Sequence, residues 1–127
     1  MTEARTWTLA YRSRPMTANA NNRKHHHARA ADVRLWREAF WGLALEAKVG
    51  RCQRVRLTVR PYLRGNRAMD TDACAPSVKA AIDGLVDARV VPNDGPGHIE
   101  AVLILPPVLG AERDEFTITI EEVPPVV

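Results

Sequence analysis

Apolar residues recur every three or four positions in two stretches of the chain, residues 28–49 and 76–88. This spacing places them along one side of an α-helix. The apolar positions of the first stretch are Val33, Trp36, Phe40, Leu43 and Ala47. Those of the second are Val78, Ala81, Ile82, Leu85 and Val86. We therefore expect two amphipathic helices, each with one buried side.

The first helix carries more apolar residues than one buried side needs. Leu35, Trp41 and Leu45 fall outside the repeating stripe. They have two interpretations: they wrap around the core of the same monomer, or they cover a second contact such as a partner subunit.

Four other stretches have the composition of β-strands: residues 6–12, 52–60, 99–105 and 115–122. Three of them alternate between apolar and polar positions, which predicts a sheet with one buried face. In residues 52–60 the polar positions include Arg54, Arg56 and Arg60, so the exposed face of this strand is basic. Polar segments at 13–27, 61–68 and 92–97 read as loops and turns.

The resulting order, β-α-β-α-β-β, predicts a single α+β domain with a mixed sheet and two helices across residues 1–127. The ends, residues 1–5 and 123–127, are expected to be flexible. No signal peptide or membrane-spanning run is recognisable, which favours a soluble, cytoplasmic protein. Cys52 and Cys74 match no zinc spacing and are expected to be free thiols.

Charge is distributed unevenly along the chain. Residues 1–67 contain 15 Lys/Arg and 4 Asp/Glu, a net charge of +11, and residues 68–127 contain 3 and 11, a net charge of −8. A basic half suggests a nucleic-acid surface. An acidic half would repel DNA unless cations neutralised its carboxylates, which suggests a bound metal.

Asp70 and Asp72 are the first candidates for such a site. In an extended backbone the side chains at i and i+2 point to the same side, so the two carboxylates could converge on one cation. Mg²⁺ prefers hard oxygen ligands of this kind and needs only one or two carboxylates from the protein.

Basic residues lie on both sides of this pair in sequence. Arg60, Arg64 and Arg67 precede it, and could hold phosphates near a metal. Arg23 and Lys24 lie in the first loop, beside His25, His26 and His27, and are a further candidate for phosphate contact. Lys79 follows on the second helix, with Asp83 and Asp87 one and two turns later. These three could equally form a solvated face with weak ion pairing.

The segment 67–95, RAMDTDACAPSVKAAIDGLVDARVVPNDG, resembles the RusA family of crossover-junction endodeoxyribonucleases of phages and prophages. The likeness lies in basic residues followed by D-x-D, a lysine, a helix that reads D-G-L, and a terminal acidic position. The segment Pro15-Met16-Thr17-Ala18-Asn19 is similar to the family's loop after the first strand.

This resemblance implies a Mg²⁺-dependent endonuclease that resolves Holliday junctions and other branched DNA during recombination and repair. It implies metal-binding carboxylates at Asp70, Asp72 and Asp94, a catalytically important lysine at Lys79, and a homodimer. Mn²⁺ is expected to substitute for Mg²⁺, with no small-molecule cofactor. DNA-backbone contacts are expected from Arg23, Lys24, Arg60, Arg64 and Arg67.

Two positions depart from the family pattern. Ala73 stands where an asparagine usually follows the second aspartate, and Asn93 stands where the acidic pair has its first carboxylate. These departures favour an alternative, a non-catalytic module that binds junctions or single-stranded DNA. A third hypothesis, an enzyme acting on a small phosphate substrate, has no glycine-rich phosphate loop to support it.

Overall fold

The computed structural model describes residues 4–17 and 26–125. Its elements follow one another as β1 (Thr6–Tyr11), α2 (His26–Glu46), β2 (Val55–Leu63), the 3₁₀ turn η1 (Thr71–Cys74), α3 (Ala75–Asp87), β3 (Ile99–Ile104), β4 (Val108–Leu109) and β5 (Glu115–Glu122). The α+β class and the two helices are confirmed. The η1 turn and the two-residue strand β4 are too short for a periodic pattern to reveal.

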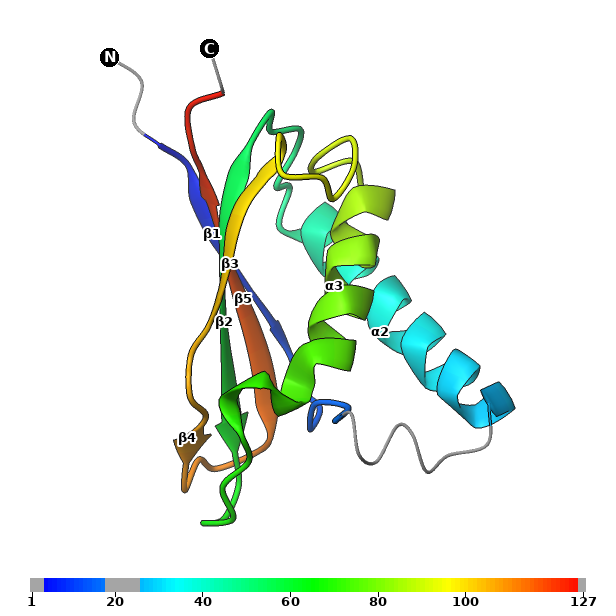
Figure 1. Ribbon diagram of the computed structural model, residues 1–127, viewed down its shortest axis with the longest axis vertical. Coiled ribbons are helices and arrows are strands. Elements are labelled where there is room, and N and C mark those ends of the chain that lie inside the picture. Colours follow the sequence, from blue (N-terminus) through cyan, green and yellow to red (C-terminus); the bar gives the residue numbers. More distant parts are fainter. Residues whose placement is uncertain (1–3, 18–25, 126–127) are drawn as a thin grey trace.

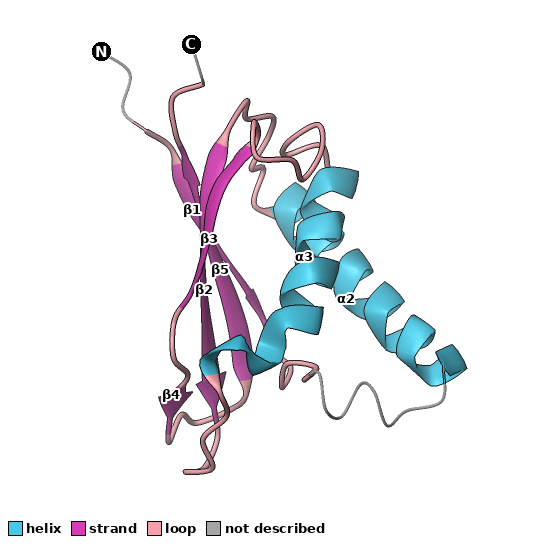
Figure 2. Ribbon diagram, viewed as in Figure 1, coloured by secondary structure: helices cyan, strands magenta, loops and turns pink. Residues whose placement is uncertain are grey.

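The strands form one mixed sheet in the order β1-β5-β2-β3, with β4 also beside β2. β5 runs antiparallel to both β1 and β2, whereas β3 runs parallel to β2. The parallel pair requires a crossover, which η1 and α3 provide. Both helices pack on the same face of the sheet, so the domain has two layers (Figures 1 and 2).

The core lies between these layers. Strand β2 buries Val55, Leu57, Val59 and Leu63 and turns Arg56 and Arg60 to the other face, which confirms the basic side expected for this strand. Aromatic rings join the layers: Trp36 of α2 meets Phe116 of β5 edge-on, with ring centroids 5.0 Å apart. Edge-to-face packing of this kind suits the charge distribution of aromatic rings.

Helices α2 and α3 approach each other closely at Gly84. A Cβ atom built there would lie 2.3 Å from the Arg37 carbonyl oxygen and 3.0 Å from the Trp41 backbone nitrogen. No side chain fits at such a distance, so the glycine sets the separation of the two helices.

The structure excludes one of the two interpretations of the extra apolar residues on α2, and the other, a second contact such as a partner subunit, stays a prediction. Leu35, Trp41 and Leu45 are 57%, 46% and 49% exposed. The interpretation that they wrap around the monomer core is therefore wrong, because the helix turns them away from the sheet. Ala47, expected in the buried stripe, lies beyond the last residue of α2 and is exposed.

Several predicted boundaries need correction. Strand β2 begins at Val55 and not at Cys52, and helix α2 runs from His26 to Glu46 and not over residues 28–49. Strand β2 continues through Pro61 to Leu63, with Pro61 opposite Phe116 of β5, so the basic turn begins only at Arg64. Near the chain ends, Arg5 pairs with Glu122, and the Val123 amide donates to the Arg54 carbonyl. Arg5 and Val123 belong to the end segments expected to be flexible, and these contacts join them to the sheet.

Candidate functional site

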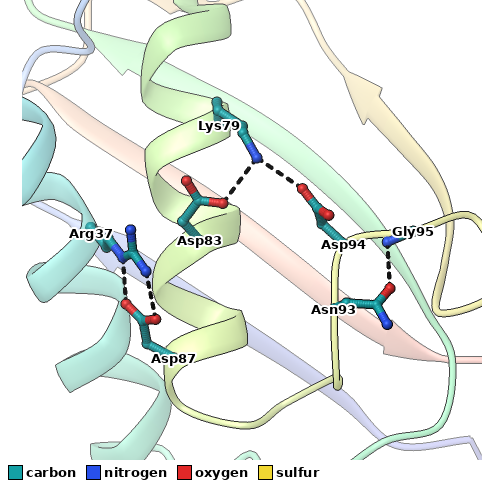
Figure 3. A network of polar contacts seen from close by, with 7 residues as sticks. All are labelled: Arg37, Lys79, Asp83, Asp87, Asn93, Asp94 and Gly95. Carbon is teal, nitrogen blue, oxygen red and sulfur yellow. Dashed lines mark hydrogen bonds and ion pairs between the residues drawn. The ribbon is translucent and has the colours of Figure 1, made fainter.

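The ammonium group of Lys79 lies between two carboxylates on the surface of α3 (Figure 3). Lys79 Nζ is 2.8 Å from Asp94 Oδ2 and 3.0 Å from Asp83 Oδ1. Asp83 is one turn further along the same helix, whereas Asp94 comes from the loop that follows it. Lys79 is only four residues into α3, about 6 Å along its axis. The loop thus brings Asp94 back to the half of α3 that adjoins η1.

The hydrogen bonds in this cluster shift the pKa of Lys79 and of Asp94 in opposite directions. The hydrogen bonds to Asp94 and then to Asp83 raise the pKa of Lys79, and the hydrogen bond from Lys79 lowers the pKa of Asp94. Each partner thus favours the charged form of the other.

Asn93 shapes the turn that carries Asp94. Its side-chain oxygen accepts a hydrogen bond of 2.8 Å from the Gly95 amide, as drawn in Figure 3. A Cβ atom at Gly95 would lie 2.8 Å from the same oxygen, so glycine suits this position. The residue that departs from the family pattern therefore has a structural task here, holding the backbone on both sides of Asp94 in a tight turn.

The backbone around Asp70 and Asp72 differs from the extended segment expected. Asp70 is extended, with φ −62° and ψ 146°, but Asp72 lies inside the 3₁₀ turn η1. The turn closes because the Ala73 amide donates to the Asp70 carbonyl at 3.0 Å. Side chains at i and i+2 point to the same side only where the whole segment is extended, and the backbone at Asp72 is not. Strand alternation therefore does not align these two carboxylates.

The three carboxylates expected to bind one metal do not gather in this structure. Among residues 4–17 and 26–125, no three His, Cys, Asp or Glu side chains lie where they could share an ion. Asp94 has the Lys79 ammonium as its partner instead. Asp70 and Asp72 lie just before α3, are exposed, and remain the residues that could contribute carboxylates to Mg²⁺ there.

The arginines expected to contact DNA have different surroundings. The Arg60 guanidinium donates to the Pro106 carbonyl at 3.2 Å on the open face of the sheet. Arg64 and Arg67 are exposed in the turn between β2 and η1, and neither guanidinium has a carboxylate partner in the described part of the chain. Arg23 and Lys24 lie outside the described residues.

Folding mixes the basic and acidic halves of the chain. Five arginines from the first half pair with carboxylates from the second: Arg5, Arg14, Arg37, Arg54 and Arg56. The expectation of a basic surface set apart from an acidic one is therefore wrong for these residues, because neighbouring strands and helices neutralise them. Arg64 and Arg67, whose guanidinium groups have no carboxylate partner among the described residues, precede the acidic turn η1 in sequence.

Three residues near this site were not predicted as functional. Asp83 was weighed only as part of a solvated face, although its four-residue spacing from Lys79 was the available signal. Asp87 follows Asp83 at the same four-residue spacing, but it binds Arg37 of α2 through two hydrogen bonds (Figure 3). Buried Ser77 accepts a hydrogen bond of 2.6 Å from the Met16 amide and so ties the loop after β1 to α3. No sequence pattern indicated that contact.

Cys52 and Cys74 are both buried and free, as expected. No helix in the described part of the chain is long and apolar enough to cross a membrane. No protein-family model matches this sequence, and no curated protein matches it.

Proposed function

We propose that the chain is a Mg²⁺-dependent, structure-specific endonuclease of the RusA type that cuts branched DNA such as four-way junctions. The main support is the arrangement around the start of α3. Lys79, near the start of this helix, is ion-paired with Asp94 of the loop that follows the helix. Asp70 and Asp72 immediately precede α3, and Arg64 and Arg67, which have no carboxylate partner among the described residues, lie just before them in sequence. The family resemblance supplies the activity.

Each of these groups has a chemical task in this proposal. Arg64 and Arg67 hold the DNA backbone through phosphate contacts, which carry little sequence information. Lys79 places a positive charge beside the phosphate that is cut, where negative charge increases in the transition state. Asp70 and Asp72, with Asp94 once Lys79 releases it, would hold Mg²⁺, which would neutralise phosphate charge and activate water when bound. Such an enzyme acts in the cytoplasm of a bacterial or phage-infected cell.

The proposal includes a homodimer, because two-fold symmetry suits the paired cutting of opposed strands in a four-way junction. The exposed Leu35, Trp41 and Leu45 on α2 give a second copy an apolar surface to cover.

A second candidate function is a non-catalytic module that binds junctions or single-stranded DNA. Two observations favour it: the three carboxylates are not gathered, and Asp94 is paired with Lys79. Ala73 also provides no side-chain amide beside Asp72.

Cleavage of a synthetic four-way junction separates the two functions. We expect nicking of the junction but not of linear duplex in Mg²⁺, and none in EDTA. Asp72→Asn should abolish nicking yet preserve or tighten junction binding, because it removes a negative charge that repels phosphate. Glu112→Gln, which changes an exposed carboxylate in the loop before β5, serves as the control and should cut normally.

Binding without cutting, even with Mn²⁺, would contradict the nuclease and favour the binding module. Restoring the family residues through Ala73→Asn and Asn93→Asp would then show whether these two positions account for the loss. If Asp72→Asn loses binding together with cutting, Asp72 has a structural role instead.

A further inference from the structure

The partner of Asp94 in this structure is a side chain of the protein itself. The Lys79 ammonium lies 2.8 Å from its carboxylate, a distance typical of a charge-assisted hydrogen bond. The pair is accessible, since the Lys79 and Asp94 side chains are 64% and 49% exposed. A cation from solution can therefore reach this carboxylate, but it meets the ammonium there.

An ammonium and a divalent cation cannot share one carboxylate without cost. Two cations a few ångströms apart repel, and a double charge doubles that repulsion. A divalent cation on Asp94 therefore requires Lys79 to move away.

Asp83 offers Lys79 a place to remain when it leaves Asp94. Its carboxylate is 3.0 Å from the ammonium and only 28% exposed, and it is fixed on the same helix one turn away. The i, i+4 spacing on α3 keeps this contact independent of the loop that carries Asp94. Lys79 thus has one partner on its own helix and one on a separate segment.

We propose that Lys79 is the resident counter-ion of Asp94, that it competes with divalent cations for this carboxylate, and that Asp83 retains it on α3 once a cation has taken its place. The competition with divalent cations rests on the proposed function, because both treat Asp94 as a metal ligand.

The competition is tested by titrating the full chain with Mn²⁺ in the absence of DNA. The electron paramagnetic resonance signal of the free ion measures how much Mn²⁺ remains unbound. Lys79→Met should tighten Mn²⁺ binding by about 1.5- to 5-fold, the range that corresponds to the loss of one exposed ion pair. Adding Asp94→Asn to Lys79→Met should reverse the gain. Lys48→Met is the matched control, since it removes an exposed lysine with no carboxylate partner among the described residues and should leave the affinity unchanged.

The retention by Asp83 is tested in the metal-free protein by the ¹⁵N signal of the Lys79 ammonium, assigned by its loss in Lys79→Met. Hydrogen bonds slow proton exchange of such a group and keep its signal visible. The signal should persist in Asp94→Asn and disappear in Asp83→Asn/Asp94→Asn. Its disappearance in Asp94→Asn alone would overturn the role of Asp83.

The outcomes also separate this inference from the proposed function. If wild type cuts junctions in Mg²⁺ but Lys79→Met binds Mn²⁺ no more tightly than Lys48→Met, the competition is wrong and the nuclease stands. If Mn²⁺ binding does not saturate in any variant and junctions are not cut, the nuclease and the competition both fail.

Discussion

At the residue scale, folding pairs some arginines with carboxylates of the protein and leaves others available to a ligand. Arg56 binds both Glu100 and Glu121 across three strands, whereas Arg64 and Arg67 keep their guanidinium groups free of carboxylates in the described part of the chain. Exposed ion pairs contribute little to stability, but they cancel charge that would otherwise attract DNA. The number of basic residues therefore overstates the surface available for phosphate.

Arg64→Ala tests this distinction. We expect weaker junction binding and a salt dependence whose logarithmic slope falls by about 1, because one phosphate contact disappears. Fluorescence anisotropy over a range of salt concentrations measures both. Arg51→Ala is the control, because Arg51 is also exposed but lies before the start of β2, whereas Arg64 follows its end. The strand between them is about 30 Å long. Equal slopes for wild type and Arg64→Ala would place Arg64 outside the DNA contact.

At the element scale, the position of Lys79 depends on how α3 packs. The helix buries Val78, Ala81 and Leu85 and leaves Lys79 exposed on another side. The contact at Gly84 fixes how closely α3 lies against α2, and the Arg37–Asp87 pair joins the two helices at the surface. The candidate site is thus held by helix packing as well as by its own ion pairs.

Gly84→Ala should destabilise the protein by about 1–3 kcal/mol, because the new methyl group overlaps the α2 backbone. Urea unfolding followed by circular dichroism measures the change. Gly42→Ala is the matched control: it places the same methyl group where nothing lies within 4 Å, and should stabilise α2 by about 0.5–1 kcal/mol. Equal effects of the two variants would mean that helix propensity, and not the close approach, governs Gly84.

At the scale of the whole molecule, one layer of helices and one sheet leave apolar surface uncovered. Leu35 and Leu45 are about half exposed on the outer side of α2, and Leu103 is 53% exposed on β3, an outer strand of the sheet. Contiguous exposed apolar patches mark surfaces that meet another chain, and the exposed residues of α2 are the candidates for such a patch. They are consistent with the proposed homodimer.

Leu45→Asp should convert a dimeric wild type to monomer, because a charge on an apolar interface costs its desolvation. Sedimentation velocity gives the mass directly. Thr6→Asp puts the same charge on an exposed position of β1 and should leave the dimer intact. If Leu45→Asp remains dimeric, α2 is not the interface. A monomeric wild type would contradict the homodimer itself.

The sequence by itself determined the class of the fold and most of its elements. The spacing of Trp36 and Phe40, of Val78 and Leu85, and of Phe116, Ile118 and Ile120 reflects burial on one side of a helix or strand, which is a local property of the chain. The sequence also identified Asp94 and Lys79 as candidate site residues. It did not predict that their side chains form an ion pair.

Only the tertiary structure decided which charges meet. Lys79 and Asp94 are fifteen residues apart, and Arg56 and Glu121 sixty-five, so their pairing depends on how the loop after α3 returns and which strands are neighbours. The 3₁₀ turn at Asp72 likewise arises from a few backbone hydrogen bonds that carry no periodic signal. Burial leaves a repeating pattern in sequence because it recurs along each element, whereas a single contact between distant segments leaves none.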